Sequence, residues 1–174
     1  MSAITNPQSV IKSNGQDVTL TWIKSDDLSS FKPYYQVYGI LFNQTGEILL
    51  IQEKGKWKIP GGTPETGETD VDTLKRELTE EADVTVSKVI PLGAQRVDYP
   101  NNPNKQEGDL YYQLRYICLV DELLPQTPDP DTGIVNPRKF VPADQITEYV
   151  KWGEVGNAMF ADAIMLHKQK LNSN

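Results

Sequence analysis

Residues 61–84 decide the fold of this chain, and they read GGTPETGETDVDTLKRELTEEADV. Thr69 is a good helix N-cap, and Asp72, three residues later, can complete a capping box. The apolar residues that follow at spacings of three and four predict one buried helical face: Val71, Leu74, Leu78 and Ala82. The stretch therefore predicts a helix over residues 69–82 that is entered from a loop containing glycine.

A second face of the predicted helix is acidic. Glu77, Glu80 and Glu81 stand at i, i+3 and i+4, so their carboxylates can converge. Two unit charges ~4 Å apart repel by about 4 kcal/mol at an effective dielectric of ~20. A divalent cation would remove that penalty, and oxygen-only ligands favour Mg²⁺ or Mn²⁺ over zinc. The alternative is a solvated acidic surface, which is how most runs of glutamate are explained.

The residues around the acidic face favour the metal-binding interpretation. Gly61 and Gly62 follow a predicted strand, and they allow the backbone to approach the carboxylates and aim a carbonyl oxygen at the same ion. Arg76 can hold the neighbouring carboxylate of Glu77 through a bidentate contact and so fix its direction. We therefore expect a cation site between the glycines and the helix.

At these residues the sequence resembles the Nudix hydrolases. The family signature is Gly, five residues, Glu, seven residues, Arg-Glu, an aliphatic residue, any residue, Glu-Glu, any residue, Gly and an aliphatic residue. Eight of nine defined positions match: Gly62, Glu68, Arg76, Glu77, Leu78, Glu80, Glu81 and Val84. The strands expected before the signature and the segment 140–146 after it also resemble the family, so the likeness covers roughly residues 34–150.

Asp83 is the one departure, because the family carries glycine there. This position closes the helix, where a left-handed residue is often needed, and Asp tolerates that conformation at a cost of order 1 kcal/mol. The expected metal-binding carboxylates are unchanged. We interpret the replacement of glycine by Asp83 as a change with a small effect on stability or loop geometry.

The resemblance implies roles for individual residues. The family pattern assigns metal binding to the carbonyl of Gly61 and to Glu80 and Glu81, with Glu77 as a further ligand or as the base that orients water. Arg76, helped by Glu68, would steer that carboxylate. The implied reaction is Mg²⁺-dependent (or Mn²⁺-dependent) hydrolysis of a diphosphate linkage in a nucleoside diphosphate joined to another group.

The final general base and the substrate stay open. Glu107 and Asp109, or Glu148 and Glu154, could supply a base outside the signature. Pro100, sixteen residues after Val84, resembles a proline of ADP-ribose pyrophosphatases in the family, which favours ADP-ribose-like sugar nucleotides as substrates. Nucleoside triphosphates stay open as a second substrate class. Tyr99 resembles, less well, the tyrosine of dinucleoside polyphosphate members. Aromatic candidates for stacking on a base are Tyr34, Tyr35, Tyr99, Tyr111, Tyr112 and Trp152.

The rest of the chain reads as strands joined by turns and loops. Alternation and β-prone runs predict strands over residues 18–22, 36–42, 48–52, 56–59, 84–90, 110–120 and 138–141, with a hairpin turn at 43–47. Seven of the twelve prolines lie between Pro100 and Pro142, so residues 99–109 and 123–137 are expected to be loops. An amphipathic helix is predicted over residues 157–171.

Composition limits the partners and the setting. The 174 residues suit one domain over 1–174, with 1–32 as an N-terminal extension that could carry a homodimer contact. A net charge of −7 argues against a nucleic acid polymer as partner. No run is apolar enough for a secretory signal or a membrane span, so we expect a cytoplasmic protein. The lone Cys118 and lone His167 are expected to be packed residues.

The resemblance implies an α/β (α+β) fold with a mixed β-sheet sandwiched between α-helices. The function it implies is a nucleotide diphosphate hydrolase. The alternative is a catalytically silent Nudix-like module that senses nucleotides, and a further one is an acidic cation-binding surface with no nucleotide role. The intact set of signature carboxylates favours the enzyme.

Overall fold

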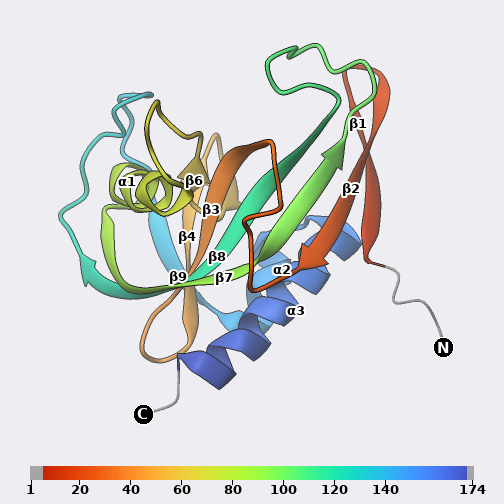
Figure 1. Ribbon diagram of the computed structural model, residues 1–174. Coiled ribbons are helices and arrows are strands. Elements are labelled where there is room, and N and C mark those ends of the chain that lie inside the picture. The colour runs from red at the N-terminus through yellow and green to blue at the C-terminus, as the bar shows by residue number, and fades with distance from the viewer. Residues whose placement is uncertain (1–5, 172–174) are drawn as a thin grey trace.

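A curled mixed β-sheet forms the centre of the structure, a computed structural model that describes residues 6–171 (Figure 1). Its strands are β1 (Gln8–Ser13), β2 (Gln16–Lys24), β3 (Tyr34–Phe42), β4 (Glu47–Glu53), β5 (Lys56–Lys58), β6 (Gly61–Gly62), β7 (Val84–Asp98), β8 (Leu110–Leu123) and β9 (Arg138–Pro142). The helices are α1 (Asp70–Ala82), the 3₁₀ turn η1 (Ala143–Gln145), α2 (Ile146–Tyr149) and α3 (Gly153–Lys170).

The sheet is mixed because one central pair of strands is parallel. The strands are ordered β1-β2-β7-β8-β3-β4-β5, with β6 paired to β3 and β9 to β4. Strands β3 and β8 run parallel, and the other pairs are antiparallel. The β3–β4 hairpin predicted around residues 43–47 is present, with Leu41 opposite Leu49.

Alternation along the strands divides the core between the two faces of the sheet. On β3, Leu41 packs with Leu74 and Leu78 of α1. Its neighbour Ile40 points to the other face and packs with residues of α3: Val155, Met159, Phe160 and Ala163. The two helices therefore cover opposite faces, which confirms the predicted arrangement of a mixed sheet between helices.

Strand β7 is longer than predicted. Pro91, which has no N–H for the ladder, suggests an end near Ile90, but a bulge between Pro91 and Gly93 lets the strand continue. Gly93 is required there because a Cβ would lie 2.3 Å from the carbonyl oxygen of Ile23. The extra residues of β7 pair with β2.

The N-terminal segment adds two strands to the same sheet. Strand β2 pairs with β7, and β1, which the sequence did not predict, pairs with β2 at the sheet edge. Residues 1–5 of the expected extension, like residues 172–174 of the expected domain, lie outside the described residues. The single domain over 1–174 and the homodimer contact stay predictions.

Helix α3 begins at Gly153, four residues before the prediction. Gly156 lies in the first turn of α3, and Trp152 packs against it. Glycine suits this position because a Cβ here would lie only 2.5 Å from the Cβ of Trp152. His167 is buried and stacks on Phe42 with ring centroids 4.1 Å apart, and Cys118 is also buried, as expected. Within residues 6–171, no helix is long and apolar enough to span a membrane.

Candidate active site

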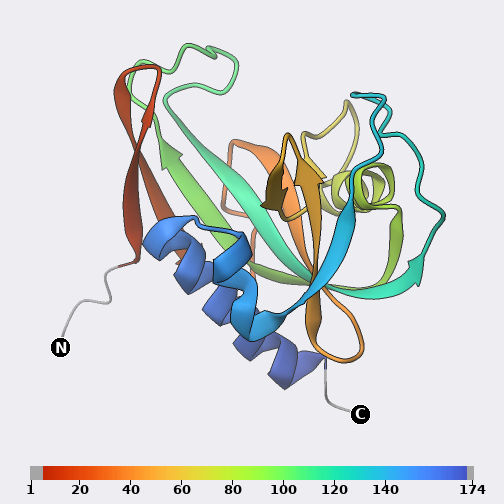
Figure 2. The same cartoon turned by 180° about the vertical axis from the view of Figure 1, so that it is seen from behind.

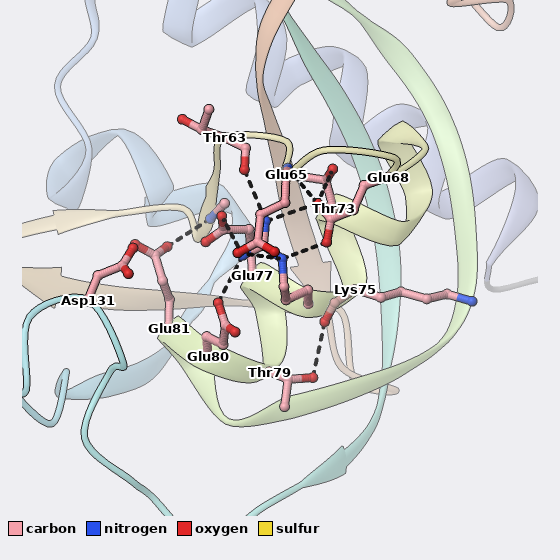
Figure 3. A network of polar contacts seen from close by, with 12 residues as sticks. Thr63, Glu65, Glu68, Thr73, Lys75, Glu77, Thr79, Glu80, Glu81 and Asp131 are labelled. Carbon is pink, nitrogen blue, oxygen red and sulfur yellow. Dashed lines mark hydrogen bonds and ion pairs between the residues drawn. The ribbon is translucent and has the colours of Figure 1, made fainter.

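The start of α1 is fixed by the predicted capping box. The Thr69 hydroxyl accepts a hydrogen bond from the backbone N–H of Asp72 at 3.1 Å, and the Asp72 carboxylate accepts from the backbone N–H of Thr69 at 3.2 Å. Leu74, Leu78 and Ala82 are buried as the stripe predicted. Because this stripe sets the rotation of α1 about its axis, the acidic face is directed toward β6 and the preceding loop (Figure 3).

Arg76 is the centre of a network of acidic side chains. Its guanidinium donates to Glu68 at 2.7 and 3.1 Å, to Glu77 at 3.0 Å and to Glu80 at 2.9 Å. A further N–H donates to the carbonyl oxygen of Thr63 at 3.0 Å, which ties the glycine-containing loop to the helix. We call Glu68, Glu77, Glu80 and Glu81 the carboxylate cluster. Arg76 holds three of its members in place, as the sequence predicted for Glu77.

The electrostatic settings of Glu68 and Glu77 differ. Hydrogen bonds from Arg76 and the backbone N–H of Glu65 hold the pKa of Glu68 down to about 2. Burial raises the pKa of Glu77, and the charges of Glu81 and Glu80 add to it, against the opposing effect of Arg76. Glu68 is thus fixed as an anion, whereas Glu77 has a greater affinity for a proton than an ordinary glutamate.

Gly62 allows Glu77 to approach the backbone. A Cβ at Gly62 would lie 2.3 Å from a carboxylate oxygen of Glu77. Any other residue there would displace that carboxylate, so the requirement for glycine at the head of the signature is steric. Strand β6 holds Gly62 in place by pairing it with Val37 of β3.

Glu81 lies on the other side of the cluster. It accepts a hydrogen bond from the backbone N–H of Gly61 at 2.8 Å, and its second oxygen contacts the ammonium of Lys58 at 3.0 Å. Lys58 also contacts Glu53 at 2.7 Å. Burial raises the pKa of Glu81 despite these partners. Gly61 here contributes its N–H, and the expected role of its carbonyl oxygen stays a prediction.

The cluster suits a hard divalent cation by its chemistry, although its side chains are not arranged as a ready ligand set. Across residues 6–171, no three acidic, His or Cys side chains are grouped so that they could hold a metal ion. The carboxylates instead contact the cations of Arg76 and Lys58. The donors are oxygen atoms only, and mutual repulsion contributes to the raised pKa of Glu77, so the residues present fit Mg²⁺. Glu80 and Glu81 would hold it, with Glu77 as a further ligand or as the base, and these roles stay predictions.

Asp83 ends α1 in the left-handed conformation expected for its position, with φ 50° and ψ 51°. Its carboxylate also accepts hydrogen bonds from the backbone N–H and hydroxyl of Thr127, at 3.1 and 2.7 Å. Arg138 donates to the carbonyl oxygens of Ala82 and Asp83 at 2.9 and 2.7 Å. The residue that replaces glycine therefore anchors the loop 124–137, a role that glycine could not have.

The anchored loop brings acidic residues that sequence reasoning missed. Asp129 is buried, and its charge adds to the burial that raises the pKa of Glu81. Its carboxylate accepts from the backbone N–H of Asp131 at 2.9 Å, and Figure 3 shows Asp131 on the Glu81 side of the cluster. No spacing in the sequence indicates this approach, because it depends on how the loop folds back onto α1.

The candidate bases outside the signature lie elsewhere. Glu107 and Asp109 both bind Asn102 within the loop that joins β7 to β8, and Figures 1 and 2 show this loop away from α1, beside the β1–β2 hairpin. Glu148 is exposed on α2. Glu154, at the start of α3, lines a cavity described below. The structure does not bring these residues into the carboxylate cluster.

Most of the candidate stacking aromatics are packing residues. Tyr99 is buried against Val18 and Tyr111, and its hydroxyl bonds Ser13 at 3.1 Å. Tyr35 packs edge-on against Tyr111, and Tyr112 packs against Phe31. Tyr34 packs against the α1-side core. Pro100 lies in the same distant loop as Glu107, so the resemblances drawn at Tyr99 and Pro100 gain no structural support.

A cavity of about 730 Å³ opens next to the cluster, on the α3 face of the sheet. Its lining includes Tyr38 and Arg115, which pair across β3 and β8, and Trp152 at the start of α3. Lys58 lines the same cavity and contacts Glu81, so one side chain joins the cavity to the cluster. Of the candidate aromatics, Trp152 is the one placed in this cavity.

Known proteins resemble the chain in sequence and in fold. Its aligned segment is 36% identical over 66 residues to the 8-oxo-dGDP phosphatase NUDT18 of Mus musculus, covering 35% of this chain and 20% of the relative. For the Homo sapiens protein of the same name, the identity is 43% over 53 residues, covering 28% of this chain and 16% of the relative. The match thus spans less than a quarter of these relatives.

Solved structures share the fold. A mutant of the Bacillus subtilis pyrophosphohydrolase BsRppH superposes with a TM-score of 0.67 at 16% identity, covering 95% of this chain and 99% of that chain. A NUDIX hydrolase from Nitrosomonas europaea gives 0.57 at 20% identity, covering 80% and 91%. A family model described as the NUDIX domain matches residues 32–161, a range that contains the carboxylate cluster and all of α1. The chain therefore belongs to the Nudix hydrolase family, as its signature predicted.

Proposed function

We propose that the protein hydrolyses a diphosphate linkage in a nucleoside diphosphate joined to another group, in a reaction that depends on Mg²⁺ or Mn²⁺. The observation that carries the proposal is the position of the carboxylate cluster. Arg76 holds Glu77 and Glu80 within 3.0 Å of its guanidinium, and Lys58 connects Glu81 to a cavity of about 730 Å³. A cavity of that size can hold a nucleoside.

The residues divide the chemical work. A bound divalent cation would supply neutralisation of the diphosphate oxygens and a lowered pKa for a bound water. Glu77, whose pKa is raised by burial, is suited to accept the proton from the attacking water. Arg76, fixed by Glu68, keeps the cluster oriented during turnover. Lys58 can exchange its contact with Glu81 for one with a substrate phosphate.

The substrate class is proposed from the family and from the relatives. Sugar nucleotides of the ADP-ribose type and nucleoside triphosphates are the candidates from the sequence. The names of the curated relatives add 8-oxo-dGDP. The acidic chain, with a net charge of −7, makes a small nucleotide a better partner than a nucleic acid polymer.

A substrate panel tests the proposal. The protein is incubated with Mg²⁺ and ADP-ribose, sugar nucleotides, nucleoside triphosphates, dinucleoside polyphosphates or 8-oxo-dGDP, and the products are identified by mass. We expect two phosphate-containing products, or inorganic phosphate from a nucleoside diphosphate, and loss of turnover with EDTA. If one nucleotide raises the melting temperature in a metal-dependent way and none is cleaved, the protein is a nucleotide-sensing module instead.

A further inference from the structure

The floor of the cavity beside the cluster is a polar patch on an otherwise apolar sheet face. Arg115 and Gln113 of β8 lie two residues apart and so point to the same side of the strand. Gln113 is opposite Gln95 on β7, and Arg115 is opposite Tyr38 on β3. Beyond this patch the same face is covered by α3 and is apolar. The polar residues thus line the cavity together with the first residues of α3.

Arg115 is a buried cation that lacks a carboxylate partner. Its residue is 3% exposed, and no ion pair involving it is formed among residues 6–171. It donates to the carbonyl oxygen of Leu114 at 3.2 Å and to the side-chain oxygen of Gln113 at 2.9 Å, while its Nε–H has no acceptor in the described part of the chain. Leaving a buried charged donor unpaired is unfavourable, so the site is poised for an acceptor from outside the chain.

The guanidinium is held in a fixed plane. Its carbon lies 4.4 Å from the centroid of the Tyr38 ring, which is a cation–π contact. Gln113 is fixed in turn, because its oxygen accepts from Gln95 at 3.0 Å and its amide donates to Gln36. A glutamine ladder across β7, β8 and β3 therefore orients Arg115. Such fixed donors suit the recognition of a planar group with acceptors in defined positions.

The walls of the cavity suit a flat ring. Trp152, whose residue is 37% exposed, stands at the mouth, and Leu20 and Ile59 supply apolar surface. Aromatic side chains stack on bases with little dependence on the base's identity. The donor-only guanidinium is then the element that can discriminate, since it accepts nothing and repels an amino group placed against it.

We propose that this cavity binds the base of the substrate and that Arg115 selects a 6-oxopurine, such as guanine or hypoxanthine, over adenine. A 6-oxopurine presents the adjacent acceptors O6 and N7, which a guanidinium can bind together, whereas adenine presents a donor amino group beside N7. This inference rests on the proposed nucleotide hydrolase function and names the base on which it acts. A discrimination of about 5- to 100-fold is expected from such a contact.

Binding of nucleoside monophosphates tests the inference without turnover. The quenching of tryptophan fluorescence is followed as GMP, IMP, AMP and 7-deaza-GMP are added to the full chain. We expect GMP and IMP to bind at least 5-fold more tightly than AMP, and 7-deaza-GMP, which lacks the N7 acceptor, to lose most of that advantage. Equal affinity for GMP and AMP in the unaltered protein overturns the inference, whatever the variants do.

Variants locate the preference. Arg115→Met should reduce the ratio of GMP to AMP affinity to below twofold. Arg115→Lys keeps the charge but not the fork, so it should keep less of the preference than the unaltered protein. Arg96→Met is the matched control, because Arg96 is on the adjacent β7 and pairs with Asp98 outside this cavity. Thermal denaturation establishes that each variant is folded, and a folded Arg115→Met that keeps the preference contradicts the proposal.

The outcomes separate this inference from the proposed function. Turnover that is equal for GDP-glucose and ADP-glucose, or for GTP and ATP, supports the hydrolase and overturns the selection by Arg115. A preference for GMP with no turnover of any substrate supports the selection by Arg115 and overturns the hydrolase function. If inorganic phosphate competes with GMP and AMP equally and only when Arg115 is present, the guanidinium binds phosphate and the base assignment is wrong.

Discussion

The two faces of the central sheet carry two different kinds of functional element. On the α1 face edge, the carboxylate cluster is built from residues close together in the chain, all contained in 58–81 together with Arg76 and Lys58. On the α3 face, the cavity is lined by residues from positions 8 to 154. The first element carries charge that must be balanced by cations, and the second carries one buried cation, Arg115. The first is the proposed reaction centre, and the second is the proposed recognition site.

Removing a cluster carboxylate should have the largest effect. Glu81→Gln and Glu80→Gln are each expected to lower turnover by about 100-fold or more, because each removes a charged oxygen that we propose as a ligand for the divalent ion. Steady-state rates with saturating Mg²⁺ measure this loss. Glu122→Gln is the control, because Glu122 is an exposed glutamate of β8. Unchanged turnover in a folded Glu81→Gln variant would show that the carboxylate cluster has no part in the reaction.

Loosening Arg76 should have a smaller effect on the same centre. Arg76→Lys keeps the charge but loses the fork that contacts Glu68, Glu77 and Glu80. We expect activity to fall by about 10- to 100-fold and the Mg²⁺ concentration at half-maximal activity to rise. Both effects are typical when a residue that orients ligands is altered. A Mg²⁺ titration of activity measures both. A fall in activity with an unchanged Mg²⁺ midpoint would argue that Arg76 does not position the metal ligands.

Substitutions of Asp83 test how the end of α1 is held in place. Asp83→Ala should destabilise the fold by about 2–3 kcal/mol, the sum of left-handed strain without a tolerant side chain and lost hydrogen bonds to Thr127. Asp83→Gly relieves the strain but loses the same bonds, so the net change should be within about 1 kcal/mol. Urea denaturation measures both. Equal destabilisation by the two variants would mean that backbone conformation has no part in the effect.

The end of α3 should show the smallest effect, through pH. Burial lowers the pKa of His167 below its usual value of 6.5, and the charge of Lys168 adds to that shift. The unfolded chain therefore takes up a proton first as the pH falls below 6.5, so acid removes stability in that window. His167→Phe, which keeps a ring against Phe42, should lose less melting temperature between pH 7.5 and 5.5. An identical loss in both proteins would contradict a neutral, buried His167.

Local sequence was enough to predict most of what lies on the α1 face. The capping box at Thr69, the buried stripe and the contacts of Arg76 all depend on residues within a few turns of one helix. The β3–β4 hairpin is equally local. The expectations for Cys118 and His167 as packed residues also held, because both lie at apolar spacings. The roles of Gly61, Glu77, Glu80 and Glu81 at a metal ion stay predictions.

Other features depend on contacts between distant segments. Strand β1 is an exception, because a local signal for it was present: Asn14 and Gly15, both with positive φ, form the two-residue turn that joins it to β2. Asp129 lies close enough for its charge to act on Glu81, in a loop that contacts of Asp83 and Arg138 tie to the end of α1. Tyr99 was a candidate for stacking on a base and is instead buried against Val18. Strand β7 passes Pro91 because a bulge absorbs the missing hydrogen bond.

The sequence by itself determined the family, the start and rotation of α1, and the acidic residues gathered on it, because helical hydrogen bonds and i, i+4 spacing act within one short segment. Only the tertiary structure decided which cations the carboxylates contact and where a nucleotide base could lie. The register of β3 against β8 places Arg115 over Tyr38, and residues at the start of α3 line the same cavity as that pair. Register between distant strands is set by the whole sheet, so no local pattern encodes it.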